Sequence, residues 1–301
     1  MSPSSHKTNR IVLWVLGAIV TALLAAVVLT LMTTAAASAA ASEPPLTVVV
    51  LGDSNSLPIA DDGQSQRWPG IALQRLSVEY PATKYALQNS SVGGIGSRQI
   101  AENIGEYCLK YEPDVVLLMI GTNDVTSWSP ATPNPGFAST EESSAAYLET
   151  IASKVDSMRY SHPRNPSGHP LLVLMTPPIA APSAVGSNGA GLGYPAAGQY
   201  GLGRPRDSLI RYGDLVTSLG ARRGLPVVGI WDSLAASGWS GTGNTSTPYI
   251  LGGVHLSQTG QAVVADQVHS ALVKQLAADG SIADGGLGNR LKAWWRSVSV
   301  K

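Results

Sequence analysis

Two side chains that are far apart in the sequence could together perform acyl transfer. Ser54 lies in the segment Gly-Asp-Ser-Asn that begins at Gly52, and His255 lies in Gly-Val-His-Leu-Ser that begins at Gly253. A serine hydroxyl attacks a carbonyl carbon when a neighbouring imidazole accepts its proton, and the acyl group is then held on the serine. The two segments therefore indicate a candidate nucleophile, Ser54, and a candidate base, His255.

Two further segments could stabilise the negative charge that develops on an attacked carbonyl oxygen. Asn123, in the segment Gly-Thr-Asn-Asp that begins at Gly121, could donate its side-chain amide to that oxygen. The segment Asn-Ser-Ser-Val-Gly-Gly that begins at Asn89 ends in two glycines, where a main-chain N–H can approach a ligand without an intervening side chain. Taken singly, each segment is also compatible with a simple surface turn.

The elements that must position these segments follow a regular alternation. Short apolar runs rich in β-branched residues are typical of buried parallel strands, and the sequence has five: Leu46–Leu51, Lys84–Gln88, Asp114–Ile120, Pro170–Met175 and Pro226–Ile230. Segments with helical spacing follow them, at Trp68–Tyr80, Arg98–Tyr111, Glu141–Tyr160, Asp207–Arg223 and Ser257–Leu276, with Ser257 as an expected N-cap. This alternation predicts an α/β domain with a parallel sheet between two layers of helices.

In this order, and with the first three each directly after a strand, the four segments resemble the blocks of the SGNH (GDSL-type) serine esterase and lipase family. The resemblance covers about residues 46–276 and implies a flavodoxin-like three-layer α/β/α sandwich with strand order 2-1-3-4-5. It implies that Ser54 is the nucleophile and His255 the base. It also implies that the oxyanion hole consists of the Ser54 N–H, the Gly94 N–H and the Asn123 side chain.

One position departs from the family pattern, which usually has an Asp three residues before the histidine. Here that position is Gly252. A main-chain carbonyl could orient the imidazole instead, or Asp232 after the fifth strand could do so, although Asp232 could equally be a helix N-cap; a slow enzyme is the third possibility. A Ser–His dyad is the simplest expectation, and no third catalytic member is assigned.

The expected function is ester hydrolysis outside the cytoplasm, on a lipid, an acylated envelope glycan or a small ester. A transferase that passes the same acyl group to a sugar hydroxyl is an alternative, and a non-catalytic binding module is another. Basic and acidic residues balance, with 20 of each, so nothing indicates a nucleic-acid partner. The scattered histidines and the single Cys108, which we expect to be a buried structural thiol, indicate neither a metal site nor a disulfide, and no cofactor is expected.

The N-terminus suggests how the chain reaches that location. Ile11–Met32 has no charged side chain, and as a helix it would be roughly 33 Å long, enough to cross a hydrocarbon core of about 30 Å. Lys7 and Arg10 precede it, which favours a cytoplasmic N-terminus and a single-pass membrane protein. Ala35–Ala41 resembles a signal-peptidase site, so a cleaved signal and a secreted protein is the alternative, and a buried core helix is a third.

These features divide the chain into five parts: a cytoplasmic N-terminus (1–10), a transmembrane signal anchor or signal peptide (11–33), a linker (34–45), the hydrolase domain (46–278) and a flexible tail (279–301). Two connections within the domain are long, at residues 125–139 and 177–205. Both follow a strand, which places them at the carboxyl edge of the sheet, where open α/β folds bind ligands. The sequence indicates no particular oligomeric state.

Overall fold

A computed structural model of the chain describes residues 14, 16–32, 44–57, 67–127, 139–160, 168–178, 205–237, 248–251 and 255–282. The chain divides into two compact units, residues 1–44 and 45–301. In the first unit, residues 14 and 16–32 are helical and exposed. The sequence predicted an anchor over residues 11–33, of which 11–13, 15 and 33 lie outside the described residues. Within the described ranges, no helix is both long and apolar enough to cross a membrane.

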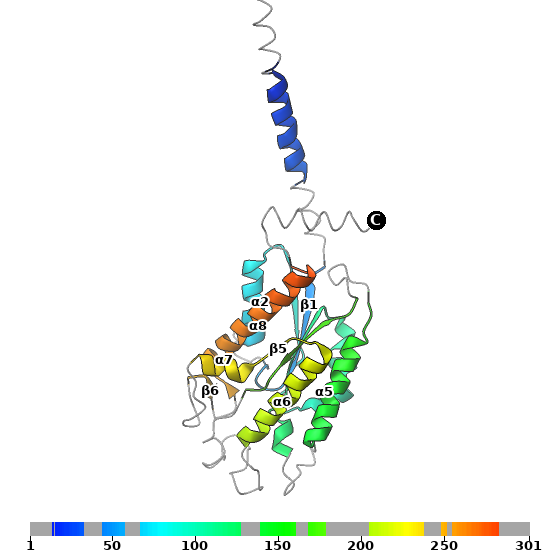
Figure 1. Cartoon of the computed structure of the whole chain (residues 1–301), viewed down its shortest axis with the longest axis vertical. Coiled ribbons are helices and arrows are strands. Elements are labelled where there is room, and N and C mark those ends of the chain that lie inside the picture. The colour runs from blue at the N-terminus through cyan, green and yellow to red at the C-terminus, as the bar shows by residue number, and fades with distance from the viewer. Residues whose placement is uncertain are drawn as a thin grey trace, which may run out of the picture. The chain divides into compact units, whose positions relative to one another are not determined.

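The second unit contains a five-stranded parallel sheet (Figure 1). Its strands are β1 (Leu46–Gly52), β2 (Tyr85–Asn89), β3 (Val115–Met119), β4 (Leu171–Met175) and β5 (Val227–Val228). Neighbouring strands follow the order β2-β1-β3-β4-β5, and every pairing in the sheet is parallel. The predicted fold class and strand order are confirmed.

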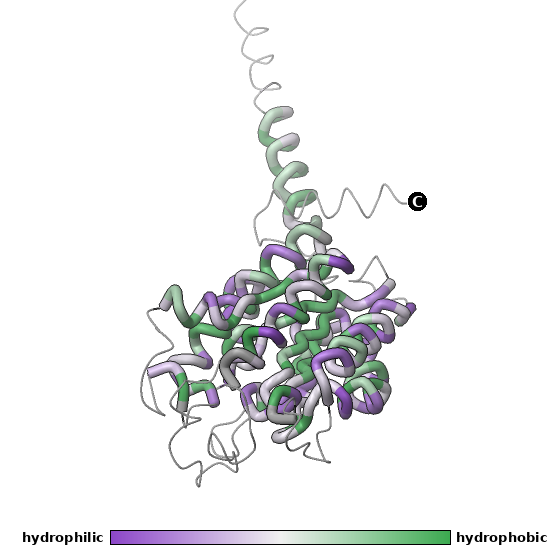
Figure 2. Tube along the Cα trace, turned by 60° about the horizontal axis from the view of Figure 1, so that its bottom comes forward, coloured by the Kyte–Doolittle hydropathy of each residue, from purple (hydrophilic) through white to green (hydrophobic). Residues whose placement is uncertain are grey.

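The central strands are buried on both faces. All five residues of β3 are buried, as are six of the seven in β1, and Val50 of β1 lies opposite Leu117 of β3. Figure 2 shows these strands as a continuous hydrophobic region inside the domain. Near-continuous apolar runs are needed in β1 and β3 because helices cover both faces of the sheet there, whereas the edge strand β2 is partly exposed along its length.

The helices form the two outer layers (Figure 1). On one face α2 (Trp68–Glu79) packs on α8 (Gln258–Asp279), which also contacts α7 (Ile230–Ala236). On the other, α5 (Glu141–Asp156) packs between α3 (Ser97–Glu102) and α6 (Pro205–Arg223). The remaining elements are α4 (Ile104–Tyr107), η2 (Leu109–Tyr111), η3 (Asp124–Ser127) and the antiparallel pair β6 (Ile250–Leu251) and β7 (His255–Leu256).

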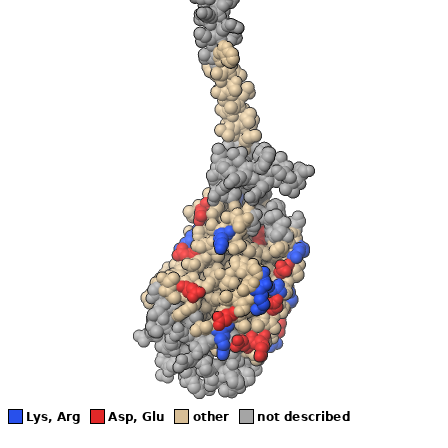
Figure 3. Space-filling model, viewed as in Figure 1, with Lys and Arg blue, Asp and Glu red and all other residues tan. Residues whose placement is uncertain are grey.

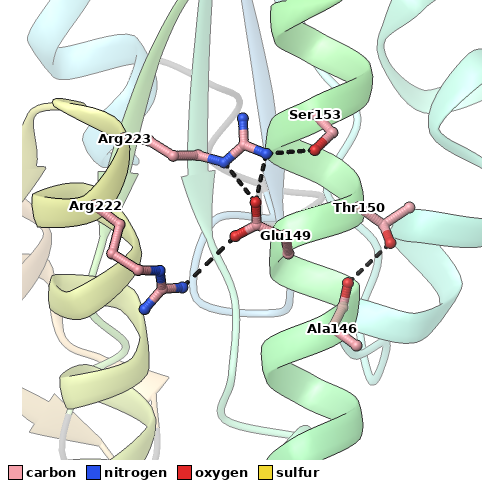
Figure 4. A network of polar contacts seen from close by, with 6 residues as sticks. All are labelled: Ala146, Glu149, Thr150, Ser153, Arg222 and Arg223. Carbon is pink, nitrogen blue, oxygen red and sulfur yellow. Dashed lines mark hydrogen bonds and ion pairs between the residues drawn. The ribbon is translucent and has the colours of Figure 1, made fainter.

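A polar network joins α5 to the end of α6 (Figure 4). The guanidinium of Arg223 donates through Nε to Glu149 Oε1 at 2.7 Å and through Nη2 to Ser153 Oγ at 2.5 Å, while Arg222 lies 3.6 Å from Glu149 Oε2. Arg223 holds the pKa of Glu149 below its usual range, with Arg222 adding to the effect. Because the side chain of Glu149 is 44% exposed, such a pair contributes at most about 1 kcal/mol.

The side chains on the face shown in Figure 3 carry charges of both signs, interspersed over the surface. This mixture agrees with the equal numbers of basic and acidic residues in the chain. The one cysteine, Cys108, is fully buried, and burial raises the pKa of its thiol to about 12. Since the thiolate is the reactive form of cysteine, Cys108 is the structural thiol that the sequence indicated.

Three predicted elements differ from the structure. The helix expected over Arg98–Tyr111 breaks into α3, α4 and η2, because Asn103 and Cys108 leave helical backbone angles. The fifth strand has two residues instead of five, since the chain turns at Gly229 into α7, which the sequence analysis missed.

Ser257 is an N-cap as predicted, and its hydroxyl accepts the N–H of Gly260 at 3.1 Å. His255 precedes this helix and lies on β7. Most of the two long connections, residues 128–138 and 179–204, lies outside the described residues.

Candidate active site

Ser54 lies in a tight turn at the carboxyl end of β1. The buried carboxylate of Asp53 accepts the N–H of Asn55 at 2.8 Å, and the Asp53 carbonyl accepts the N–H groups of Ser56 and Leu57, both at 3.1 Å. Gly52 is required before the turn, because a Cβ atom there would lie 2.5 Å from the Ser56 hydroxyl. The turn leaves Ser54 partly exposed while Asp53, Asn55 and Ser56 are buried.

The structure brings Ser54 and His255 together although 201 residues separate them. His255 Nε2 lies 2.9 Å from Ser54 Oγ, within hydrogen-bonding distance. For a base, Nε2 must be the unprotonated nitrogen, so that the serine hydroxyl donates to it. The imidazole is half-buried on β7, and the pairing of β7 with β6 fixes the main chain beneath it.

Two buried side chains, those of Asn55 and Gln261, connect the serine turn to the histidine strand and to the start of α2. Asn55 Oδ1 accepts the N–H of Leu256, the residue after the histidine, at 2.9 Å. Gln261 Nε2 donates to the Asn55 carbonyl at 3.1 Å, and its Oε1 accepts the N–H of Trp68 at 2.9 Å. The sequence analysis assigned no role to Asn55, Gln261 or Trp68. Gln261 lies one turn after the N-cap Ser257, but the helical spacing around it gives no signal that it bridges two segments.

The turn that contains Gly94 is fixed against the serine turn. Asn89 Nδ2 donates to the Ser56 carbonyl at 2.8 Å, and the N–H of Val92 donates to the Gly52 carbonyl at 3.1 Å. Gly94 has a φ of +81°, a left-handed conformation that glycine adopts without strain. Among the described residues, neither the N–H of Gly94 nor that of Ser54 has a hydrogen-bond acceptor, so both remain available to an oxyanion.

Asn123 is the third predicted donor, and it is buried directly after β3. Its Nδ2 donates to the carbonyl of Ile95, the residue after Gly94, at 2.8 Å. This bond fixes the orientation of the amide relative to the Gly94 turn. The structure therefore links Asn123 directly to the turn that carries the Gly94 donor.

The structure does not bring Asp232 to the histidine. Asp232 is exposed in the first turn of α7, where its carboxylate lies over Gly229. No ion pair or hydrogen bond among the described residues joins it to His255. Gly252, the position of the family's usual Asp, lies outside the described residues, as do Gly253 and Val254.

A cation that the sequence did not indicate acts on the histidine. Burial lowers the pKa of His255, and the positive charge of the buried Arg67 lowers it further. We therefore expect the acidic limb of the pH profile of kcat/KM to have its midpoint below about 6.5, the ordinary value for histidine. The Arg67→Gln variant removes the charge and should raise that midpoint, because the imidazolium is then less disfavoured.

The control is Arg75→Gln, which removes an exposed cation of α2 that pairs with Asp266. This variant should keep the wild-type profile. A midpoint that stays in place, or that falls, in Arg67→Gln would show that Arg67 does not act on the base.

Comparison with known families gives a match over most of this domain. Residues 50–263 match the model of the GDSL-like lipase/acylhydrolase family, a span that includes the serine turn, the Gly94 turn, Asn123 and His255. The chain belongs to this family. The resemblance inferred from the four polar segments is confirmed, and the protein is a serine ester hydrolase.

Solved structures with the same fold include esterases and lipases. The acetylxylan esterase Axe2 from Geobacillus stearothermophilus has a TM-score of 0.55 at 16% identity, over 78% of this chain and 95% of Axe2. A lipase/acylhydrolase from Enterococcus faecalis has a TM-score of 0.54 at 18% identity, over 80% of this chain and 98% of its own. LAE5, an α/β hydrolase enzyme from the metagenome of Lake Arreo, Spain, has a TM-score of 0.56 at 16% identity, over 76% of this chain and 95% of LAE5. Among curated protein sequences, none matches this chain.

Proposed function

We propose that this enzyme hydrolyses carboxylic esters through an acyl intermediate on Ser54, with His255 as the general base. The observation that carries the proposal is the 2.9 Å contact between His255 Nε2 and Ser54 Oγ at the carboxyl edge of the sheet. Nε2 takes the hydroxyl proton as Oγ attacks the ester carbonyl carbon, and the imidazolium then protonates the departing alkoxide. Water, deprotonated by the same nitrogen, then attacks the acyl-Ser54 carbonyl. The bond from the acyl carbon to Oγ breaks, the imidazolium returns its proton to Oγ, and the carboxylic acid leaves.

The donors around Ser54 support this chemistry. In the tetrahedral intermediate the former carbonyl oxygen carries a full negative charge, and the N–H groups of Ser54 and Gly94 are available to it. The side-chain amide of Asn123, oriented by its bond to the Ile95 carbonyl, is the third proposed donor. Preorganised donors of this kind are typically worth about 3–4 kcal/mol each, because they need no reorganisation as the charge develops.

Catalysis is favoured over a non-catalytic binding module. A binding module that had lost catalysis would have no reason to keep the serine hydroxyl in contact with an imidazole, which this chain does. A transferase would use the same acyl-enzyme, so it differs only in the acceptor. Candidate substrates remain a lipid, an acylated envelope glycan or a small ester, and we take an acetyl ester as the first to test because Axe2 is named an acetylxylan esterase.

The experiment uses purified protein and p-nitrophenyl esters of increasing chain length, beginning with the acetate. A fluorophosphonate probe should label the enzyme, and peptide mass spectrometry should place the label on Ser54. Product analysis with an added sugar alcohol separates the hydrolase, which releases free acid, from a transferase, which yields the sugar ester. Labelling of another residue, or no ester turnover in folded protein, would contradict the proposal.

We further propose that the domain acts outside the cytoplasm. Support comes from the sequence: an uncharged apolar run at residues 11–32, preceded by Lys7 and Arg10. In membranes of the native host, an anchored enzyme should resist carbonate extraction and keep its N-terminal residues. A soluble species that begins near Ser42 would instead indicate a cleaved signal, and full-length protein in the cytoplasmic fraction would contradict export.

A further inference from the structure

A buried carboxylate lies directly behind the oxyanion donors. Asp124, the residue after Asn123, is 2% exposed. Both of its carboxylate oxygens accept the main-chain N–H of Ser97, at 3.0 Å each, and Oδ1 also accepts the Ser97 hydroxyl at 2.5 Å. The side chain of Ser144 in α5 hydrogen-bonds the same carboxylate. These bonds offset part of the cost of burial, which raises the pKa of Asp124.

Asn123 and Asp124 form hydrogen bonds to the two residues on either side of Gly96. Asn123 Nδ2 holds the Ile95 carbonyl, and the Asp124 carboxylate holds Ser97, the first residue of α3. Between these points lies Gly96, where a Cβ atom would be 3.0 Å from Asp124 Oδ2 and 3.1 Å from its Cγ. The carboxylate therefore packs closely against the main chain of Gly96, and a side chain at this position would force the carboxylate or the segment to shift.

The segment from Val92 to Ser97 is thus fixed at both ends. Its first N–H is bonded to the Gly52 carbonyl beside the nucleophile turn, and its last residue is bonded to Asp124. Gly94 lies between these two ends and has no hydrogen bond of its own main-chain N–H to a described residue. The position of the Gly94 donor relative to the Asn123 donor consequently depends on the bond between Asp124 and Ser97.

We propose that Asp124 is a positioning residue of the oxyanion hole: its carboxylate sets the spacing between the Gly94 N–H and the Asn123 amide. The inference rests on the proposed function, because these donors matter only if Ser54 forms a tetrahedral adduct. Displacing a catalytic group by about 1 Å can cost about 10²-fold in rate. A smaller displacement of two donors weakens binding of the transition state more than binding of the neutral ester.

The test replaces Asp124 with asparagine in the full-length enzyme. Asparagine keeps the size of the side chain, but it has one acceptor oxygen for the two Ser97 donors and turns an amide nitrogen toward them. With p-nitrophenyl acetate we expect kcat to fall about tenfold while KM stays within about twofold. Ser97→Ala keeps the main-chain bond to Asp124 and removes the hydroxyl, with its bonds to Asp124 and to Tyr212. It should lower kcat in the same direction by a smaller factor.

Ser144→Ala is the matched control, because it removes a hydrogen bond to the same carboxylate from α5 rather than from the Gly94 segment. It should lower the midpoint of thermal unfolding without changing kcat. A role in stability alone predicts instead that Ser97→Ala and Ser144→Ala behave alike. In the double variant Asn123→Ala with Asp124→Asn, the loss in kcat should be smaller than the product of the single losses, since one of the two positioned donors is already missing.

The outcomes separate this inference from the proposed function. Wild-type turnover and Ser54 labelling, combined with unchanged kcat in folded Asp124→Asn, would overturn the positioning role and leave the esterase intact. The same loss of kcat in Ser144→Ala as in Ser97→Ala would also overturn it. A wild-type enzyme that neither turns over esters nor reacts with the probe would overturn the proposed function, and the inference with it.

Discussion

The Ser54→Ala variant should lower kcat for p-nitrophenyl acetate by about 10⁴-fold or more and abolish fluorophosphonate labelling. The change deletes the one atom, Oγ, that lies 2.9 Å from His255 Nε2 and would form the acyl bond. What remains is hydrolysis by water assisted by the oxyanion donors, a slow reaction that keeps only part of the rate enhancement. Steady-state kinetics and gel-based labelling measure the two effects independently.

Ser90→Ala is a matched control, since Ser90 also follows a strand of the sheet. Its hydroxyl accepts a hydrogen bond from Gln88 Nε2 at 3.3 Å, and its main-chain bond to the Val50 carbonyl is unaffected by the change. This variant should retain both turnover and labelling. If Ser54→Ala hydrolysed the ester at the wild-type rate, Ser54 would not be the nucleophile, even if the probe labelled Ser54 in the wild-type enzyme.

The sequence was sufficient to predict the parallel sheet and the order in which the polar segments follow its strands. The runs that form β1 and β3 are continuously apolar because both of their faces are covered, and this leaves a local signal. Ser54 and Asn123 follow those strands directly, so the parallel topology alone brings them to one edge. The resemblance to a known family then related His255, 201 residues away, to Ser54.

The groups that hold the site together left no comparable signal. Gln261 bonds both Asn55 and Trp68, yet nothing in a helical pattern distinguishes an inward glutamine that bridges two segments from one that faces water. Arg67 acts on His255 through space, and a charge that acts over distance has no periodicity in the sequence. The strand β7 was missed because two residues are too short for an alternating pattern to be recognised.

Gly96 and Asp124 are a further pair whose residues are visible in the sequence but whose contact is not. Asp124 was visible in the segment after β3, and Gly96 two residues after Gly94, but each could be explained by an ordinary turn. Only the distance from the glycine main chain to the carboxylate shows that one residue needs the other. Long-range packing of this kind follows from the fold and cannot be read from either segment alone.

The Asn123→Ala variant should lower kcat by about 10²–10³-fold, with a much smaller change in KM. The amide is oriented by its bond to the Ile95 carbonyl, and we expect it to donate to the oxyanion, which forms in the transition state and is absent from the bound ester. The loss corresponds to about 3–4 kcal/mol. Loss of the Ile95 bond should also lower the free energy of unfolding by about 1 kcal/mol, measured by chemical denaturation.

Asn103→Ala separates these two effects. Asn103 is also an asparagine whose Nδ2 donates to a main-chain carbonyl, that of Gln99 at 3.0 Å, but it is exposed between α3 and α4. The Asn103 variant should lose stability and keep kcat, whereas the Asn123 variant should lose both. Asn123→Asp should be slower still, because a carboxylate beside the oxyanion repels the charge that the amide stabilises. A rise in KM alone for Asn123→Ala would make Asn123 a substrate-binding residue and leave the oxyanion with the main-chain donors of Ser54 and Gly94.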